Sequence, residues 1–392
     1  MTRKQLNILR PPVTLFVSLS ILSLLIPAAA LSQASPELAR LYNAFTVTHA
    51  AALNAIAEVD RDPRFAQAQA EMRLQLEQMQ DQGPSHQNHG QMMSHGMTAT
   101  PETSHAHNSD MDELDLGMRV ELARVVRGDH SDAEAAEAYS NVADLPRHAA
   151  MVLARGRQFE EQLWQLWADP DLDIDAKLLA TQAVIETYLT GDDMYTVSAR
   201  PKPASLYLDH AYAGSLKRVY PRVSGLLWSN QWLHLASLEA MIRGQVDPQF
   251  EGQVGETLAR YNNKLGSGSG MSMFPAPVEM PTVPTIAPTL YTLAPEAAII
   301  VDNLNMLDAA ITDIIAYPGL DAQTREQAIL AKVAQFTDRD IATDDMSYLL
   351  SALRGGIYNQ GGPAIGELMG SERNRSRDAM GMQHHMSMSG PN

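Results

Sequence analysis

Apolar residues recur along most of the chain at the spacing of amphipathic helices. One stripe consists of Val152, Phe159, Leu163 and Leu166, which are separated by seven, four and three positions. Such spacing puts all four side chains on one face of a helix. Alternation of polar and apolar residues, the pattern of a half-buried strand, is confined to short connecting stretches. We therefore predict an all-α fold.

Four turn signals interrupt this helical pattern. Each contains a proline between two amphipathic runs, and an aspartate precedes three of the four prolines, Pro63, Pro170, Pro248 and Pro318. Asp before Pro is typical of a helix start, because the carboxylate accepts from free backbone N–H groups and proline needs no hydrogen bond there. The pattern predicts four helical hairpins, or about eight principal helices.

The four hairpins are of two kinds that alternate along the chain. When the first turn is aligned with the third, His49 falls on His234, and the Ala and Leu residues that follow recur in step. When the second turn is aligned with the fourth, apolar positions match without a gap from Leu145 on Leu293 onward. This repetition predicts an internal duplication into two helical-hairpin bundles. Generic similarity between helices rich in Ala and Leu is the alternative.

The predicted helices and the stretches between them divide the chain into parts. Two insertions lack the helical pattern, and the second is rich in Gly, Ser and Pro, so we expect no regular structure there. The parts are a signal peptide at 1–34, a first bundle at 35–190 with an insertion at 83–110, a joint at 191–220, a second bundle at 221–345 with an insertion at 266–292, and a C-terminal region at 346–392.

The first 34 residues have the layout of a secretory signal peptide. A basic start precedes an apolar run from Val13 to Ile26, then Pro27, then small residues before a cleavage site after Ala34. The apolar run is short for a membrane span; an uncleaved N-terminal anchor is the alternative. We expect an exported protein of a Gram-negative periplasm, with no membrane span after cleavage.

Composition narrows the chemistry that is available. The chain has 46 Asp and Glu against 29 Lys and Arg, a net charge of −17, which disfavours nucleic acid or an anionic membrane as the main partner. The absence of Cys excludes disulfides, thiolate metal sites, iron–sulfur clusters and thiol catalysis. Because the chain has 21 Met and 12 His, any soft-metal site must use thioether and imidazole groups.

Many of these Met and His residues gather where the helical pattern is missing. Two segments, 83–110 and 380–388, contain seven of the 12 His, interleaved with Met and surrounded by Gly, Ser, Gln and Asn. We call these segments the arms. The second insertion adds a third group of Met residues, Met271, Met273 and Met280. The candidate metal ligands, here called the arm donors, are His86, His89, Met92, Met93, His95, Met97, His105, His107, Met380, Met382, His384, His385, Met386 and Met388.

The mixture of donors points to copper. Thioether sulfur is a soft, neutral ligand that favours Cu(I) or Ag(I), and imidazole suits both oxidation states of copper. The alternate spacing of Met93, His95 and Met97 lets neighbouring donors converge on one ion. Clusters of His alone, or of His with Asp, would favour zinc or nickel instead. We therefore expect copper as the bound metal.

The arms resemble the Met/His-rich segments of Gram-negative periplasmic copper-resistance proteins. The resemblance covers residues 83–111 and 380–388 and is one of composition; it does not extend to the helical body. It implies that copper is captured, buffered or handed on by flexible arms. The alternative for these segments is a polar linker and tail without a metal role.

Outside the arms, few residues suggest chemistry. His49 and His234 are either a buried pair of ligands or proton carriers, one per half, or core histidines hydrogen-bonded to a neighbouring helix. The acidic run 169–175 has the alternating carboxylates of a calcium loop, but Gly is missing at its sixth position and Glu at its twelfth, so we interpret it as a helix start. No helical stretch contains Glu-x-x-His, and phosphate-binding glycine loops and nucleophile elbows are missing.

The sequence thus predicts an exported copper-binding protein that captures, buffers or hands on Cu(I), Cu(II) or Ag(I) through its arms. We expect a binding protein rather than an enzyme, with a metal ion and a periplasmic protein as partners. Two alternatives stay open. One is a helical scaffold or interaction protein without a metal role, and the other is a redox metalloenzyme with a site near His49 and His234.

Overall fold

A computed structural model describes most of the chain between the predicted signal peptide and the C-terminal tail. Its regular elements are fifteen α-helices and short 3-10 turns, and the described residues contain no strand, which confirms the all-α prediction. None of these helices is both long and apolar enough to cross a membrane. The described residues are 36–81, 109–169, 171–191, 193–250, 252–266 and 279–358.

Long helices flank all four predicted turns. Three of the pairs pack as hairpins. The pairs are α1 (Pro36–Arg61) with α2 (Ala66–Asp81), α5 (Arg147–Ala168) with α6 (Ile174–Leu189), α9 (Pro221–Val246) with α10 (Gln253–Gly266), and α13 (Pro295–Ala316) with α14 (Ala322–Thr337).

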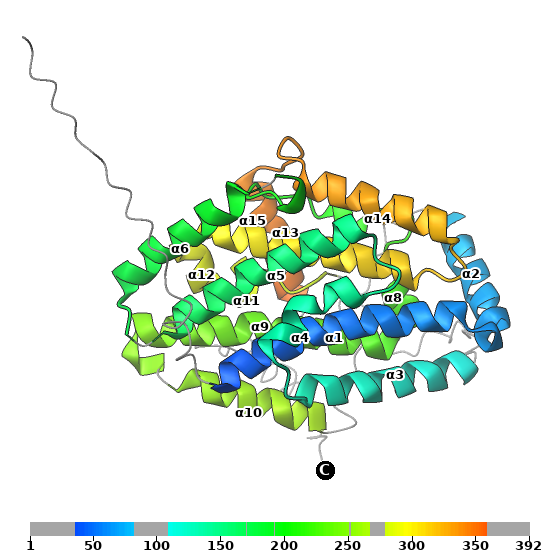
Figure 1. The fold of residues 1–392 in the computed structure, drawn as a ribbon, viewed down its shortest axis with the longest axis horizontal. Coiled ribbons are helices and arrows are strands. Elements are labelled where there is room, and N and C mark those ends of the chain that lie inside the picture. The colour runs from blue at the N-terminus through cyan, green and yellow to red at the C-terminus, as the bar shows by residue number, and fades with distance from the viewer. Residues whose placement is uncertain are drawn as a thin grey trace, which may run out of the picture.

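The first pair, α1 and α2, does not pack as a hairpin, so the prediction of four hairpins is wrong at this turn. α1 packs along α3 (Ser109–Arg127) instead of α2. α3 buries an apolar stripe that includes Met118, Leu122 and Val126, whereas the buried apolar residues described in α2 are Ala68 and Leu76. α2 turns away across the end of the molecule, where Arg73 donates to the carbonyl of Gly319 at 2.8 Å (Figure 1).

Short helices occupy the remaining connections. Two of them lie in the second insertion, so the expectation that 266–292 lacks regular structure is wrong for its last part. Met280 in that part is buried in the core rather than free to bind an ion. The short α-helices are α4 (Asp132–Glu137), α7 (Ser205–Leu208), α8 (Ser215–Val219), α11 (Val283–Ile286) and α12 (Pro288–Leu293), and α15 (Asp345–Tyr358) follows α14.

Aspartates accept from backbone N–H groups at the turns: Asp62 does so before Pro63 as predicted, whereas α6 is capped by Asp173 and not by Asp169, the aspartate before Pro170. Asp62 accepts from the backbone N–H of Arg64 at 2.9 Å, and Asp173 accepts from that of Ala176 at 2.8 Å as the N-cap of α6. Each satisfies a backbone donor that the helix itself leaves free. The acidic run 169–175 therefore starts a helix, as expected.

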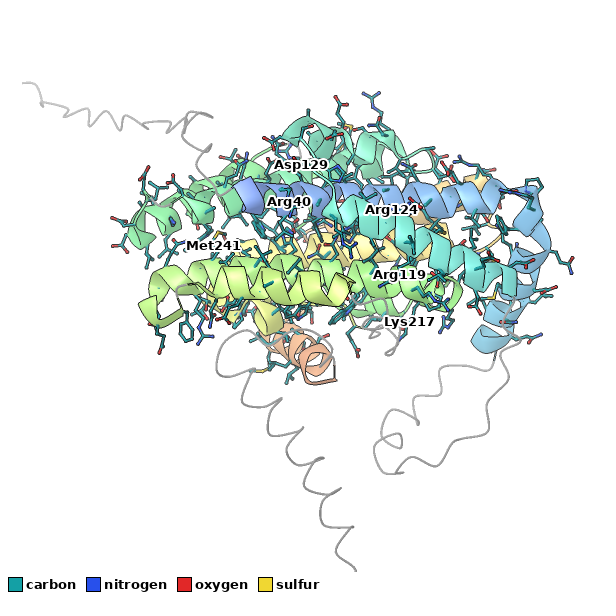
Figure 2. The ribbon with its side chains drawn as sticks, turned by 90° about the horizontal axis from the view of Figure 1, so that it is seen from below. Arg40, Arg119, Arg124, Asp129, Lys217 and Met241 are labelled. Atoms are coloured by element: carbon teal, nitrogen blue, oxygen red, sulfur yellow. The ribbon has the colours of Figure 1, made fainter. Side chains whose placement is uncertain are left out.

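The four long helices α1, α5, α9 and α13 form one central core. α1 contacts the other three, and α5 contacts both α9 and α13. α6 and α14 cover one side, while α3 and α10 lie end to end along the opposite side (Figures 1 and 2). Helices from the two predicted halves thus share a single core instead of enclosing one each.

Matching helices of the two halves have equal lengths. α1 and α9 have 26 residues each, α5 and α13 have 22, and α6 and α14 have 16. The lengths agree with the predicted duplication, but they do not establish it, and the duplication stays a prediction.

Candidate functional site: a buried charge cluster and its cavity

The arm donors lie outside the described residues, so the structure neither brings them together nor separates them. The same holds for the predicted signal peptide, 1–34. Within the described ranges, no group of three or more His, Asp or Glu side chains is placed to hold a metal ion. The donors outside these ranges are His86, His89, Met92, Met93, His95, Met97, His105 and His107 in the first arm, and Met380, Met382, His384, His385, Met386 and Met388 in the second.

The two histidines that the sequence aligns meet at the centre of the core. His49 comes from α1 and His234 from α9, with exposed fractions of 8% and 3%. The ring of Phe45 lies between them, with ring centroids 4.4 Å from His49 and 4.3 Å from His234. The matching positions of the two halves are therefore neighbours in space.

Neighbouring groups hold both rings in neutral form. The indole N–H of Trp164 donates to Nε2 of His234 at 2.8 Å. Nδ1 of His49 lies 3.0 Å from the carbonyl oxygen of Phe45, so this nitrogen carries the proton and Nε2 is left as an acceptor. Burial lowers the pKa of both histidines, and the Arg157 guanidinium lowers both further, while the Asp308 carboxylate raises the pKa of His49. These contacts fit the interpretation as core histidines.

A buried ion-pair cluster lies beside the histidines, centred on Arg157 of α5. Its guanidinium donates to Glu160 and to Asp308, each at 2.7 Å, and to the side-chain oxygen of Asn305 at 3.0 Å. The hydroxyl of Tyr139 donates to Asp308 at 2.9 Å. The side chains of Arg157, Glu160 and Asp308 are 5% exposed or less. The cluster therefore joins α5 to α13 by charge in the interior.

Close packing of α5 on α13 makes this geometry possible. Gly156 faces Leu304, and a Cβ atom at Gly156 would lie 2.5 Å from a methyl carbon of that leucine. The absence of a side chain lets the two backbones approach at this point. Arg157, the next residue, then reaches the carboxylate of Asp308.

The cluster has more hydrogen-bonding atoms than partners. One carboxylate oxygen each of Glu160 and Asp308, Nε of Arg157 and Nδ1 of His234 are buried without a partner among the described residues. Burial raises the pKa of Glu160 against the opposing effect of Arg157. With two carboxylates against one guanidinium, the cluster carries excess negative charge when both are ionised. Buried groups of this kind cost free energy and are rare.

The two acidic residues of the cluster occupy matching positions in the two halves, although the periodicity of the sequence does not mark them as buried. In the alignment of the second and fourth turns, Glu160 falls on Asp308 and Arg157 on Asn305. The helical periodicity identifies the apolar stripes of α5 and α13. Arg157, Glu160 and Asp308 lie beside these stripes, and charged residues at such positions are usually exposed. The sign of this cluster in the sequence is that both halves carry an acidic residue at the matching position, Glu160 in one and Asp308 in the other.

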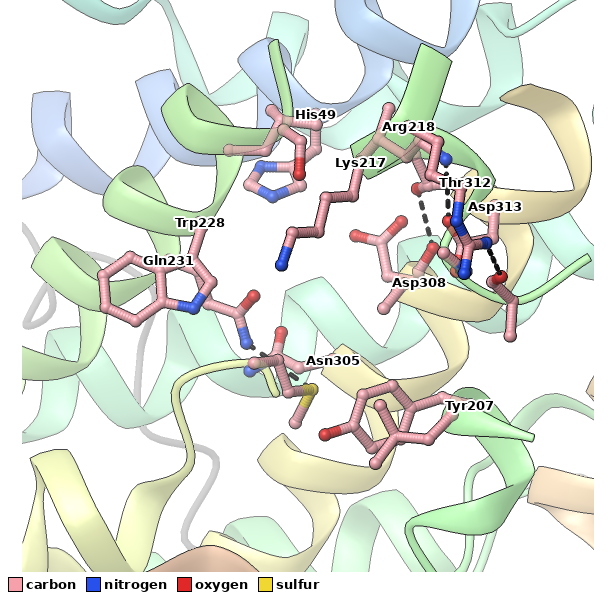
Figure 3. A pocket seen from close by; sticks show the side chains of 18 residues that line it. His49, Tyr207, Lys217, Arg218, Trp228, Gln231, Asn305, Asp308, Thr312 and Asp313 are labelled. Carbon is pink, nitrogen blue, oxygen red and sulfur yellow. Dashed lines mark hydrogen bonds between the residues drawn. The ribbon is translucent and has the colours of Figure 1, made fainter. Parts of the chain in front are cut away.

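A cavity of about 190 Å³ adjoins the cluster. It lies between α1, α8, α9 and α13, and its walls include His49, Lys217, Trp228, Asn305 and Asp308 (Figure 3). The cluster therefore reaches the cavity through Asp308 and Asn305. Periodicity along the chain does not indicate this space, because its walls come from separate segments that include residues of α1, α8, α9 and α13.

Lys217 supplies a cation to the cavity. Figure 3 shows its ammonium directed between Gln231, Asn305 and Asp308. Burial lowers the pKa of Lys217, while the Glu279 carboxylate raises it. No described residue forms a hydrogen bond or an ion pair with Lys217. An unpaired cation and the acidic cluster thus face the same small space.

No protein-family model, curated protein or solved structure matches the chain. The function is therefore inferred from the residues of the chain itself.

Proposed function

We propose that this protein is an exported copper-binding protein that captures, buffers or hands on Cu(I), Cu(II) or Ag(I) through its two arms. The observation that carries the proposal is the interleaving of thioether and imidazole donors in segments without core-forming residues. This mixture matches the ligand preferences of copper in both oxidation states. The helical body acts as the scaffold that carries the arms, and a periplasmic protein is the expected partner for transfer.

The contacts within the core support placing the metal in the arms. Arg157 pairs with both acids of the buried cluster, and Nε2 of His234 already accepts from Trp164. The acceptors that remain free there do not form a metal site, since no group of three or more His, Asp or Glu side chains in the described part of the chain is placed to hold an ion.

The positions of the helix ends allow the arms to be changed without disturbing the core. The first arm follows α2, which ends at Asp81, and all eight of its donors precede α3, which begins at Ser109. The second arm follows α15, which ends at Tyr358. Replacing every arm donor, Met by Leu and His by Gln, therefore removes the ligands while the described helices keep their sequence.

Titration with Cu(I) under a competing chelator, without oxygen, tests the proposal. We expect the intact protein to bind more than one equivalent and the variant without arm donors to lose most of this binding. The matched control replaces Met271 and Met273 by Leu and is expected to bind as the intact protein does. Equal binding by the intact protein and the variant without arm donors would overturn the proposal.

A further inference from the structure

Two groups in the wall of the cavity beside the cluster can donate hydrogen bonds. The ammonium of Lys217 points into the space. The amide of Asn305 also lines it; its oxygen accepts from Arg157, and its nitrogen has no bond to a described residue. An ammonium and an amide N–H side by side suit the two oxygens of a carboxylate.

His49 and Asp308, which also line the cavity, offer a hydrogen-bond acceptor and a negative charge instead of donors. Nε2 of His49 is an acceptor, because Nδ1 of that ring bonds to the backbone carbonyl of Phe45. One carboxylate oxygen of Asp308 is bonded to Arg157 and Tyr139, and the other is buried without a partner among the described residues. The acceptor of His49 and the nearby carboxylate favour a ligand group that donates a hydrogen bond and carries positive charge.

The rest of the wall limits the size and polarity of a ligand. Leu216, Leu227, Ala309 and the ring of Trp228 contribute apolar surface. The volume of about 190 Å³ lies below that of pockets for drug-sized ligands. A ligand with both charges therefore needs to be small, with a short apolar group.

We propose that this cavity binds a small apolar α-amino acid as a zwitterion. Its carboxylate is held by Lys217 and Asn305, its ammonium faces His49 and Asp308, and its side chain lies against the apolar wall. This site is separate from the arms and does not depend on the copper proposal.

Calorimetric titration of the full chain with three probes tests this assignment. L-valine carries both charges, isovalerate is valine without its ammonium group, and isobutylamine is valine without its carboxylate. We expect valine to bind at least about tenfold more tightly than either of the other probes, since each charge-assisted hydrogen bond is worth that much. Equal affinity for valine and isovalerate, or no binding of valine, would overturn the assignment.

Variants test whether Lys217 is the side chain that binds the carboxylate of valine. Lys217→Met is expected to lower the affinity for valine about tenfold or more, because the carboxylate loses its cation. Arg218→Met is the matched control, since Arg218 also lines the cavity but donates to the carbonyl of Ala213 at 2.9 Å. Circular dichroism checks that both variants fold. Unchanged valine affinity in folded Lys217→Met would refute the proposal.

Discussion

Arg157 is the residue that balances charge at the centre of the molecule. It bonds to Glu160 and Asp308 at 2.7 Å, and all three side chains are buried. A buried ion pair adds little net stability when it is complete, but loss of one partner leaves uncompensated charge in a medium of low polarity. The effect of a substitution therefore depends on what remains in the cluster.

We expect Arg157→Met to lower the free energy of unfolding by about 3–5 kcal/mol, because Glu160 and Asp308 lose their cation. Urea denaturation at pH 7 measures the change. Arg124→Met is the control, since Arg124 pairs with Glu121 on the surface and both side chains are more than 60% exposed; it should cost less than about 1 kcal/mol. Equal losses in the two variants would contradict this account of the cluster.

Substitution of His234 distinguishes the two interpretations of the paired histidines, as metal ligands or as core residues. Because its Nε2 accepts from Trp164, Gln at this position can keep an acceptor for the indole N–H. We expect His234→Gln to bind as much copper as the intact protein and to keep the fold, measured by metal analysis and circular dichroism. A fall in copper stoichiometry in the folded variant would favour the ligand interpretation.

At the scale of elements, a buried acid attaches the last described helix to the core. Asp302 of α13 accepts from the hydroxyl of Tyr348 in α15 at 2.6 Å and from the N–H of Val283 in α11 at 2.9 Å. Burial raises the pKa of Asp302 from 3.8 to about 7. The stability of the folded chain therefore depends on the protonation of this carboxyl, while the hydrogen bonds from Tyr348 and Val283 favour its ionised form.

The sign of the pH effect follows from the raised pKa. The folded protein binds this proton more tightly than the unfolded chain, so the stabilisation is complete below the ordinary pKa of 3.8 and is lost as pH rises through about 7. We expect the free energy of unfolding to fall less between pH 5 and pH 8 in Asp302→Asn than in the wild type. Asp321→Asn is the control: the pKa of Asp321 is lowered by its bonds to Thr324, so its contribution is lost only as pH falls below the ordinary value. An unchanged pH dependence in Asp302→Asn would contradict the assignment.

The helices themselves could be predicted because their signals are local. The stripe on α5 and the aspartates before proline at Pro63 and Pro248 correctly marked helices and turns. The partner of α1 could not be predicted, because α2 and α3 compete for the same face. That choice depends on how much apolar surface each helix brings, and α3 brings more.

At the scale of the whole molecule, the aligned positions of the two halves come together in one core. The alignment of the first and third turns matches His49 with His234, and the alignment of the second and fourth turns matches Glu160 with Asp308. The cavity could not be predicted, since Lys217 reaches it from a five-residue helix in the joint between the halves. Such a site depends on the packing of distant segments, which periodicity does not specify.

We propose that the arms, and not the core, carry copper. The decisive measurement is elemental analysis of protein purified from its own host, with the intact chain and the variant without arm donors compared side by side. We expect copper in the intact protein and little or none in the variant. Copper retained by the variant would contradict it and favour a site near His49 and His234, and an intact protein without metal would contradict it in favour of a helical scaffold.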